Sequence, residues 1–402
     1  MKTMNTMAST IRPLAPVLVF CGIIAFTAVG ASPQTQPNFG DPLADLTADQ
    51  LARFFAGQTE FLESEKQNAG LGPVFNDTAC ANCHDVPKIG GGSTIIETRF
   101  GRIGSNGKFD PMTEKGGSLI QSQGLGRLNA SCNFVGETPP ATATIIARRR
   151  TTPLFGLGLV DAVPDDAFKA LAQQQAVSVR GIVNMVKNLS TGEPAVGKFG
   201  WKAQVPTLFQ FSGDAYLNEM GITNPQFRDE NCPQGNCDLL RDCNPRPGLN
   251  DDGEGVEKFT DFMKFLAAPP PDPTANPLDV KAGGQLFQNI GCASCHQPKL
   301  TTGPNDVAVL NQVDFFPYSD FLLHDMGSLG DGITQGDATG QLMRTAPLWG
   351  VRVIERFLHD GRATTLEQAI LAHDGQAKPA RNRFKDLSPS DQKLLIAFLK
   401  SL

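Results

Sequence analysis

Apolar residues that recur at helical intervals predict four helices in this chain. The first follows Thr47 and Gln50, which have the spacing of a helix-capping box. The last can pack back on the third, because each presents one apolar face. The four segments, with the residues expected on their buried faces, are 46–55 (Leu51, Phe54, Phe55), 253–268 (Val256, Phe259, Phe262, Met263, Leu266), 279–296 (Leu286, Phe287, Ile290) and 387–402 (Leu394, Leu395, Phe398, Leu399).

The remainder of the chain has weak strand patterning and many turn-forming residues. Its 41 Gly and 29 Pro favour ordered coil between helices. The sequence therefore predicts a mainly α fold with long irregular loops, and its length suggests two domains. The Pro-rich segment 268–277 cannot sustain a helix, so we expect it to link an N-terminal domain (32–267) to a C-terminal domain (278–402).

Residues 1–31 have the pattern of a secretory signal peptide. Lys2 and Arg12 are the charged residues of this segment, Leu14 to Ala28 is mostly apolar, and small residues follow at 29–31. The apolar core is shorter than the roughly 20 residues that a spanning helix needs. An uncleaved anchor and a lipid on Cys21 are the alternatives. No later segment is apolar enough to span a membrane.

Two copies of the pattern Cys-x-x-Cys-His carry the strongest chemical signal. They are Cys80-Ala-Asn-Cys83-His84 and Cys292-Ala-Ser-Cys295-His296. Two thiols three residues apart on one helical turn can each add to a vinyl group of haem, and the next imidazole then ligates the iron. The motifs therefore predict two covalently bound haem c groups, which implies two haem-binding domains of the cytochrome c kind.

Zinc and dithiol chemistry are the competing interpretations of these motifs. A structural zinc ion needs four ligands in two close pairs, whereas these motifs lie more than 200 residues apart. A redox dithiol would need a βαβ setting and no obligatory histidine. Covalent haem attachment takes place outside the cytoplasm in Gram-negative bacteria, so the export signal and the motifs both predict a periplasmic protein.

Four more cysteines belong to the exported part of the chain. Cys132, Cys232, Cys237 and Cys243 are an even number in an oxidising compartment, which predicts two disulfides. The sequence allows three connectivities, and a reactive thiol is the minority alternative. Removal of residues 1–31 takes away two cations, so the net charge changes from −6 to −8. This mild acidity argues against nucleic acid and suits a small basic electron-donor protein.

Several segments resemble those of a known family. "RTAPLWGVRVIERFLHDGRATTLEQAILAH" (344–373) is similar to bacterial di-haem cytochrome c peroxidases and to the methylamine-dehydrogenase maturation enzyme. "LGPVFNDTACANCH", "RRRTTPLFGLGLVDAVP", "KFGWKAQVPTLFQFSGDAYLNEMGITNP", "YSDFLLHDMGSLGDGI" and "FLHDGRATTLEQAILAHDG" resemble di-haem oxidoreductases described as peroxidases and also labelled thiol oxidoreductases. This closer resemblance covers nearly all of the exported chain.

The resemblance implies unequal ligation of the two irons. In the peroxidases a Met is the sixth ligand of the C-terminal haem, and here His373 stands in that register. His296 and His373 are therefore expected to ligate the second iron, with Met326 as the alternative to His373. Two imidazoles hold a haem six-coordinate and at lower potential than His/Met, which suits an electron store. His84 ligates the first iron, which must then be the reactive one.

Glu219 and Trp201 are the expected catalytic residues. Glu219, in "LNEMG", matches the distal Glu of the peroxidases, which moves a proton between the two peroxide oxygens. The plain alternative is a solvated carboxylate at a helix end. Trp201 is a candidate relay for electrons between the haems, Trp349 competes with it, and ordinary packing is the alternative for both. Met220 is expected in the same pocket as Glu219.

Other residues have less specific expectations. His324 and His359 are expected near haem propionates or the interface between the domains. Five arginines can pair with propionates, although runs of Arg are usually solvated: Arg148, Arg149, Arg150, Arg344 and Arg362. The resembled peroxidases hold calcium between their domains. The segment 244–255 has oxygen ligands for calcium but lacks the twelve-residue loop pattern, so no calcium site is assigned.

These observations favour an exported di-haem enzyme. Its first haem would reduce hydrogen peroxide with electrons that a small donor protein, a cytochrome c or a cupredoxin-like protein, delivers through the second haem. The same iron could instead oxidise an organic or protein substrate. The third hypothesis is an electron-transfer cytochrome in which both irons are fully ligated, with His324 on the first haem. No residue argues for a thiol substrate.

Overall fold

The four helices expected from the apolar pattern are all present in the structure, a computed structural model that describes Met1 and residues 37–402. They are α1 (Ala48–Leu62), α7 (Glu254–Phe265), α8 (Pro277–Asn289) and α11 (Pro389–Lys400). The capping box of α1 is formed as expected, because Thr47 Oγ1 accepts from the Gln50 amide and Gln50 Oε1 accepts from the Thr47 amide. The predicted signal peptide lies outside the described residues.

Helices predominate over strands, which confirms the mainly α fold. The remaining α-helices are α2 (Cys80–Cys83), α3 (Leu157–Asp161), α4 (Asp165–Gln174), α5 (Leu208–Met220), α6 (Cys237–Cys243), α9 (Leu366–Ala372) and α10 (Lys378–Asp386). The strands are β1 (Val74–Phe75), β2 (Ile96–Ile103), β3 (Phe109–Asp110), β4 (Gln123–Gly124), β5 (Gly126–Arg127), β6 (Asn133–Phe134), β7 (Ile145–Arg150), β8 (Met185–Lys187), β9 (Pro194–Val196), β10 (Leu300–Thr301), β11 (Asp314–Phe315), β12 (Leu323–Asp325) and β13 (Leu342–Arg344).

The buried face of α7 is the expected one, but that of α1 is not. All five residues expected on the buried face of α7 are buried. On α1, Phe54 is fully buried, but Phe55 is 49% exposed and Leu51 is also exposed, so their predicted burial was wrong. The buried stripe continues instead through Gly57 and Phe61. A Cβ at Gly57 would lie 2.2 Å from the Lys258 carbonyl oxygen, so glycine lets α7 approach closely.

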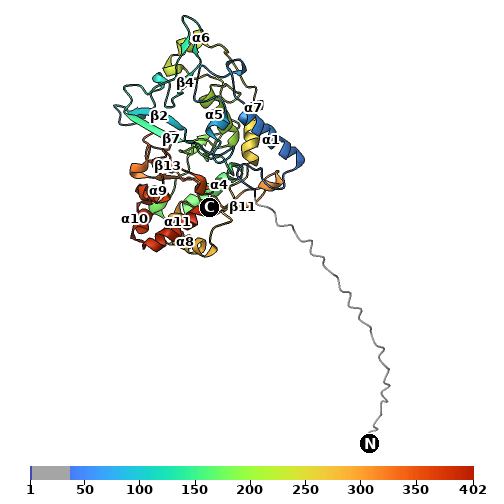
Figure 1. The fold of residues 1–402 in the computed structure, drawn as a ribbon, viewed down its shortest axis with the longest axis vertical. Helices are drawn as coiled ribbons and strands as arrows, with labels where there is room; N and C mark the ends of the chain where they lie inside the picture. The colour runs from blue at the N-terminus through green and yellow to red at the C-terminus, as the bar shows by residue number, and fades with distance from the viewer. Residues whose placement is uncertain (2–36) are drawn as a thin grey trace. The chain divides into compact units, whose positions relative to one another are not determined.

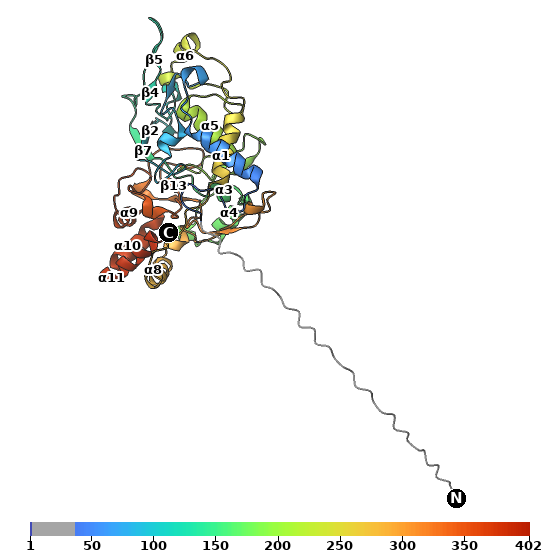
Figure 2. The ribbon, with the colours of Figure 1, turned by 45° about the vertical axis from the view of Figure 1, so that its right-hand side comes forward.

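The C-terminal helix packs on the helix that precedes the second Cys-x-x-Cys-His motif, as the sequence predicts. Phe287 of α8 and Phe398 of α11 have ring centroids 5.2 Å apart, and both are buried. A Cβ at Gly283 would lie 2.1 Å from the Leu394 carbonyl oxygen, so α8 and α11 meet nearly backbone to backbone. Figures 1 and 2 show α8, α10 and α11 together at the lower end of the described chain, below α1 and α5.

The longest strand pair was not foreseen. Strands β2 and β7 are antiparallel, with Ile96 opposite Arg150 and Gly101 opposite Ile145, and β3 adds a third strand. The triple Arg148–Arg150 hid the alternation of β7. Arg148 is exposed, while Arg149 is only 2% exposed. An inward position of a strand normally carries an apolar residue. Because Arg149 occupies one, the sequence of β7 lacks the apolar–polar alternation that indicates a strand.

A buried ion cluster explains why Arg149 can point inward. Asp331 lies 2.7 Å from a guanidinium nitrogen of Arg149 and 2.8 Å from the Lys202 ammonium. Lys202 also donates to the Thr339 and Leu342 carbonyls. Two cations and one carboxylate leave the cluster with an excess positive charge beside β7, which matters for the site described below.

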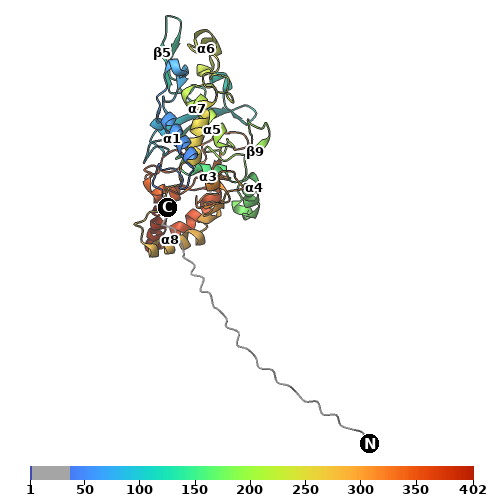
Figure 3. The ribbon, with the colours of Figure 1, turned by 90° about the vertical axis from the view of Figure 1, so that its right-hand side faces the viewer.

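The Pro-rich segment connects α7 to α8 without a helix or strand of its own. Pro269 packs near Gly350, and the Asp272 amide donates to the Ser401 carbonyl. Residues Gln36–Leu402 form one compact unit, and the separate domains 32–267 and 278–402 stay a prediction. Within the described residues, no helix is both long and apolar enough to cross a membrane. Figure 3 shows α8 below α1, α5 and α7.

The four remaining cysteines form the two predicted disulfides. The pairs are Cys132–Cys243 and Cys232–Cys237, which selects one of the three connectivities. Cys80, Cys83, Cys292 and Cys295 are free thiols. The structure therefore keeps unpaired only those described cysteines that belong to the two Cys-x-x-Cys-His motifs.

The two disulfides are expected to differ in their effect on stability, because they close loops of very different length. Cys132–Cys243 spans 111 residues and Cys232–Cys237 spans 5. Loop-closure entropy predicts that replacing the first pair by Ser lowers the free energy of unfolding by up to about 5 kcal/mol, against about 2 kcal/mol for the second. Urea denaturation of the two double variants measures this order, and equal losses would contradict it.

Candidate functional site

The first motif lies on a short helix in the wall of a large cavity, which we call the first cavity. Cys80 and Cys83 are on α2, and His84 follows directly after it. All three line the cavity. The His84 Nδ1–H donates to the Gly91 carbonyl oxygen at 2.9 Å. Because a carbonyl can only accept, Nδ1 carries the proton and Nε2 keeps its lone pair for a metal.

The second motif lines a second cavity in the same manner. Cys292, Cys295 and His296 follow α8, and the His296 Nδ1–H donates to the Tyr318 carbonyl at 3.0 Å. His373, at the end of α9, lies across the cavity, and its Nδ1–H donates to the Ala369 carbonyl at 2.8 Å. Both imidazoles therefore keep Nε2 free as a ligand.

The spacing of the two imidazoles fits an iron held between them. The ring centroids of His296 and His373 are 6.4 Å apart. Two metal–imidazole bonds of about 2 Å each, extended by the distance from nitrogen to ring centre, span about 6 Å. Burial lowers the pKa of His296 to about 4, so the neutral, ligating form prevails at neutral pH. Met326 also lines this cavity.

The lining of the first cavity is rich in acidic groups. Glu219, at the end of α5, lines the cavity and accepts a 2.7 Å hydrogen bond from the Asn76 side-chain amide. Burial and the nearby carboxylate of Glu97 raise the pKa of Glu219 to about 7. A group that titrates near neutral pH can both take up and release a proton, as a general acid–base catalyst must.

Three further charged residues, Glu97, Arg99 and Asp214, line this cavity and were missed by sequence reasoning. Arg99 pairs with Glu97 on β2, and both line the first cavity. Asp214, on α5, also lines it, and burial raises the pKa of Asp214 to about 6. Asp214 and Glu219 are both on α5, where no helix was predicted, so none of these three residues had a signal in the sequence.

No second histidine faces the first cavity. The described residues include all five histidines of the chain, and His84 alone lines this cavity. His324 lines the second cavity instead, which disfavours the hypothesis of an electron-transfer cytochrome with His324 on the first haem. The reason is the fold of β12, which places His324 beside the second motif. Met220 lines the first cavity, as expected.

A family model described as "Di-haem oxidoreductase, putative peroxidase" matches residues 141–402, which is more than half of the chain. The chain belongs to this family. Membership confirms the resemblance seen in the sequence and implies haem as the cofactor. The two cavities of this di-haem oxidoreductase each hold a Cys-x-x-Cys-His motif, and the free thiols and ligating imidazole tautomers fit the group.

Two solved structures are similar to this di-haem oxidoreductase over most of its length. Hydrazine synthase of Kuenenia stuttgartiensis has a TM-score of 0.44 and 14% identity, covering 97% of this chain and 100% of that one. A MauG-like protein associated with microbial copper homeostasis has a TM-score of 0.41 and 13% identity, covering 92% and 94%. No curated protein matches the chain.

Trp201 and Arg150 line both cavities of the di-haem oxidoreductase. The indole N–H of Trp201 donates to the Arg150 carbonyl at 3.0 Å, which fixes the ring. Its edge meets His359, which lines the second cavity, with ring centroids 6.2 Å apart. Trp349 packs on Phe315 instead and lines neither cavity, so of the two tryptophans only Trp201 lies between the cavities, where a relay would have to lie.

The five arginines fall into three groups. Arg148 and Arg362 are exposed, and Arg362 pairs with Asp360. Arg150 and Arg344 line the second cavity and donate mainly to backbone carbonyls. Arg149 lines the first cavity, and its guanidinium group is held by Asp331 and Gln335. The excess positive charge of the cluster of Arg149, Lys202 and Asp331 fits a haem propionate.

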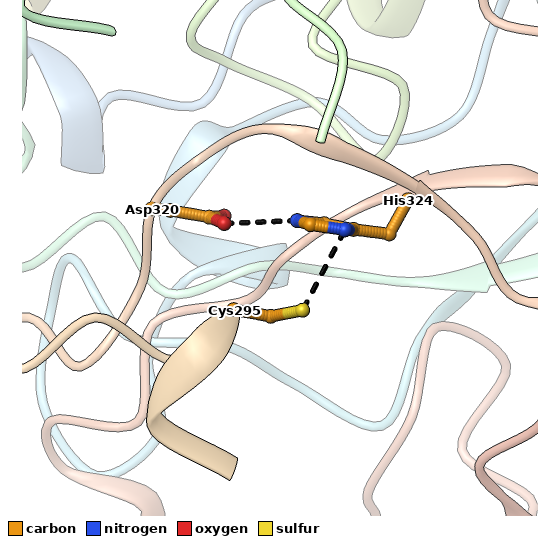
Figure 4. A group of neighbouring side chains, drawn as sticks. All are labelled: Cys295, Asp320 and His324. Atoms are coloured by element: carbon orange, nitrogen blue, oxygen red, sulfur yellow. Dashed lines mark hydrogen bonds and ion pairs between the residues drawn. The ribbon is translucent and has the colours of Figure 1, made fainter. Parts of the chain in front are cut away.

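Cys295, Asp320 and His324 form one close group beside the second motif (Figure 4). The His324 Nε2–H donates to Asp320 at 2.8 Å, and Nδ1 lies 3.5 Å from Cys295 Sγ. Burial lowers the pKa of His324, but the hydrogen bonds and charges of Asp320 and Cys295 together outweigh this and raise it. A metal ion could bind this group only if Cys295 were a free thiolate. If Cys295 instead forms a thioether with haem, His324 Nδ1–H can donate a hydrogen bond to its sulfur.

Proposed function

We propose that this di-haem oxidoreductase is an exported peroxidase that carries two covalently attached haem c groups. Hydrogen peroxide is reduced in the first cavity, and electrons arrive through the second. Cys80 and Cys83 would hold the first haem with His84 as ligand. Cys292 and Cys295 would hold the second, with His296 and His373 as ligands. The periplasm is the proposed compartment, because it combines haem attachment with disulfide formation.

The acidic lining of the first cavity is the observation that carries this proposal. Haem bound there supplies an iron that exchanges electrons with peroxide. Glu219 supplies the proton transfer: its carboxylate takes a proton from one peroxide oxygen and returns it to the other as the O–O bond breaks. Asn76 holds the carboxylate in place through its 2.7 Å hydrogen bond. The pKa of Glu219, near 7, makes both transfers accessible at neutral pH.

The contrast between the two cavities supports the direction of electron flow. His296 and His373 face each other across the second cavity, while the first has one histidine. An iron closed on both sides stores and passes electrons, and an iron with an open side binds peroxide. This contrast also disfavours an electron-transfer cytochrome with both irons closed. The donor is proposed to be a small basic cytochrome c or cupredoxin-like protein.

Steady-state kinetics with a reduced cytochrome c donor tests the proposed function. Oxidation of the donor should depend on hydrogen peroxide, with about two donors oxidised per peroxide because the reduction takes two electrons. An enzyme that instead oxidises an organic or protein substrate would react with peroxide but oxidise the donor slowly. Slow donor oxidation would therefore overturn the peroxidase assignment.

Replacing Trp201 by Phe is expected to slow electron transfer between the two sites. Trp201 lines both cavities, and Phe keeps the packing but is much harder to oxidise. The expected slowing is at least about tenfold, or about 1.4 kcal/mol in the barrier. Stopped-flow spectroscopy of the half-reduced protein measures it.

Trp349→Phe is the matched control for this prediction. It replaces the other of the two tryptophans in the chain, which packs in the core and lines neither cavity. The control should transfer electrons at the wild-type rate. Equal rates in wild type and Trp201→Phe would remove Trp201 from the pathway.

A further inference from the structure

Tyr216 is one of two tyrosines in the chain and lies on the wall of the first cavity. It is on α5, one turn before Glu219, and only 6% of it is exposed. Its ring packs edge-on against Phe259, with centroids 4.9 Å apart. The phenol is therefore held rigidly beside the group that Cys80 and His84 would bind.

The hydroxyl of Tyr216 donates to a buried carboxylate. The distance from the Tyr216 oxygen to Glu65 Oε1 is 2.7 Å, and Glu65 is only 8% exposed. The Glu65 side chain makes no ion pair with any described residue, and the Tyr216 hydroxyl is its hydrogen-bond partner. A carboxylate at this distance is within the range over which a proton can be transferred directly.

This pair has the two components that oxidation of a tyrosine requires at neutral pH. Removing an electron from a phenol makes its proton strongly acidic, so the electron leaves readily only where a base takes the proton. Glu65 is such a base, and the first cavity is where an oxidant forms. No cationic side chain among the described residues pairs with Glu65. No positive charge therefore weakens its carboxylate as a proton acceptor.

We propose that Tyr216 and Glu65 form a redox-active pair that supplies one electron during the reaction with peroxide. The inference rests on the proposed function. Reduction of hydrogen peroxide to two waters takes two electrons and two protons. In this step the O–H bond of Tyr216 breaks, the proton goes to Glu65 Oε1 and the electron goes to the peroxide-derived oxidant in the first cavity. A neutral phenoxyl radical remains on Tyr216.

The cycle closes with an electron from the donor protein. That electron reduces the phenoxyl oxygen, and the proton returns to it from Glu65, which restores both side chains. The second electron for the peroxide comes from the donor-reduced second site. The pair thus lets the enzyme complete the two-electron reduction of peroxide when the second site holds only one electron from the donor.

Tyr318, the second tyrosine, provides an internal comparison. It packs against Phe287 and Phe398 beside the second cavity. Its hydroxyl makes no hydrogen bond with a described residue, so no base is positioned to accept its proton. The structure therefore assigns the redox role to one tyrosine only.

Electron paramagnetic resonance of the half-reduced holoprotein, in which the second site carries one electron, tests the pair in samples frozen within milliseconds of adding hydrogen peroxide without further donor. Wild type should give a tyrosyl radical whose hyperfine structure narrows when the protein contains ring-deuterated tyrosine. The signal should be absent in Tyr216→Phe and retained in Tyr318→Phe. In Glu65→Gln, whose amide can accept the hydrogen bond but not the proton, the yield should fall at least about tenfold.

Donor turnover of the same wild-type preparation separates the possible failures. Peroxide-dependent turnover without a deuterium-sensitive radical would overturn the tyrosine pair and leave the proposed function standing. A radical that persists in Tyr216→Phe would also overturn the pair. Absence of both reaction with peroxide and turnover would overturn the proposed function, and the pair with it. The deuterium experiment uses unmodified protein, so it does not depend on how well a variant folds.

Discussion

Replacing Glu219 by Gln is expected to lower kcat/KM for hydrogen peroxide by about 10²–10⁴-fold, the usual contribution of a positioned acid–base group. Gln keeps the size of the side chain and can still accept the hydrogen bond from Asn76. It cannot carry a proton between the peroxide oxygens. Haem content and the spectrum of the second site should stay as in wild type, because Glu219 lines only the first cavity.

The pH dependence gives a second measure of the same role. The carboxylate form of Glu219 takes the first proton, and this form is the minority below its pKa of about 7. In wild type, kcat/KM for peroxide should therefore rise with pH up to about 7 and then level off. In Glu219→Gln this inflection should disappear.

Glu230→Gln is the matched control for Glu219. Burial raises the pKa of Glu230 to about 8, but Glu230 lines neither cavity. Its replacement should leave both kcat/KM and the inflection near pH 7 unchanged. If Glu219→Gln keeps the wild-type rate and pH profile, Glu219 has no acid–base role in the reaction.

Replacing His373 by Ala is expected to open the second iron. The variant removes one of two imidazoles whose centroids are 6.4 Å apart, so the ferric spectrum of this site should change from low-spin to high-spin. The potential of the second site should rise, and peroxide turnover with a reduced donor should fall by at least about tenfold. Resonance Raman spectroscopy measures the change in spin state.

Met326→Leu distinguishes His373 from the alternative ligand. Met326 lines the same cavity, so both side chains are near the expected iron. Leu keeps the bulk and removes the sulfur. If His373 is the ligand, Met326→Leu remains low-spin. A high-spin second site in Met326→Leu, together with a low-spin one in His373→Ala, would assign the ligand to Met326.

The parts of the site that were predictable from sequence are those encoded locally or matched to a family segment. Cys80 to His84 and Cys292 to His296 each lie within five residues, so their spacing alone indicates haem. The resemblance gave His373 and Glu219 their expected roles, and the structure places each in the expected cavity. Those roles remain predictions until the variants are measured.

The parts that sequence could not supply depend on contacts between distant residues. Glu65 and Tyr216 are 151 residues apart, and Arg149 and Asp331 are 182 apart. Neither pair has a local signal, because an ion pair or hydrogen bond depends on the tertiary fold and not on spacing. The same reason explains the missed strand β7, since Arg149 occupies an inward position only where Asp331 neutralises it.

The burial of α1 shows a different limit. Leu51, Phe54 and Phe55 were expected on one face, but the buried stripe runs through Phe54, Gly57 and Phe61. Glycine carries no apolar signal, although at this position its small size lets α7 pack closely. A pattern of apolar residues therefore predicts the wrong buried face wherever two helices meet through backbone atoms.

Low-temperature electron paramagnetic resonance of the ferric holoprotein, before and after addition of cyanide, tests the central claim most directly. Two haems in unequal surroundings should give one low-spin signal that cyanide does not alter and one high-spin signal of equal intensity that cyanide converts to low-spin. Two low-spin signals, both indifferent to cyanide, would contradict an open iron beside His84 and Glu219.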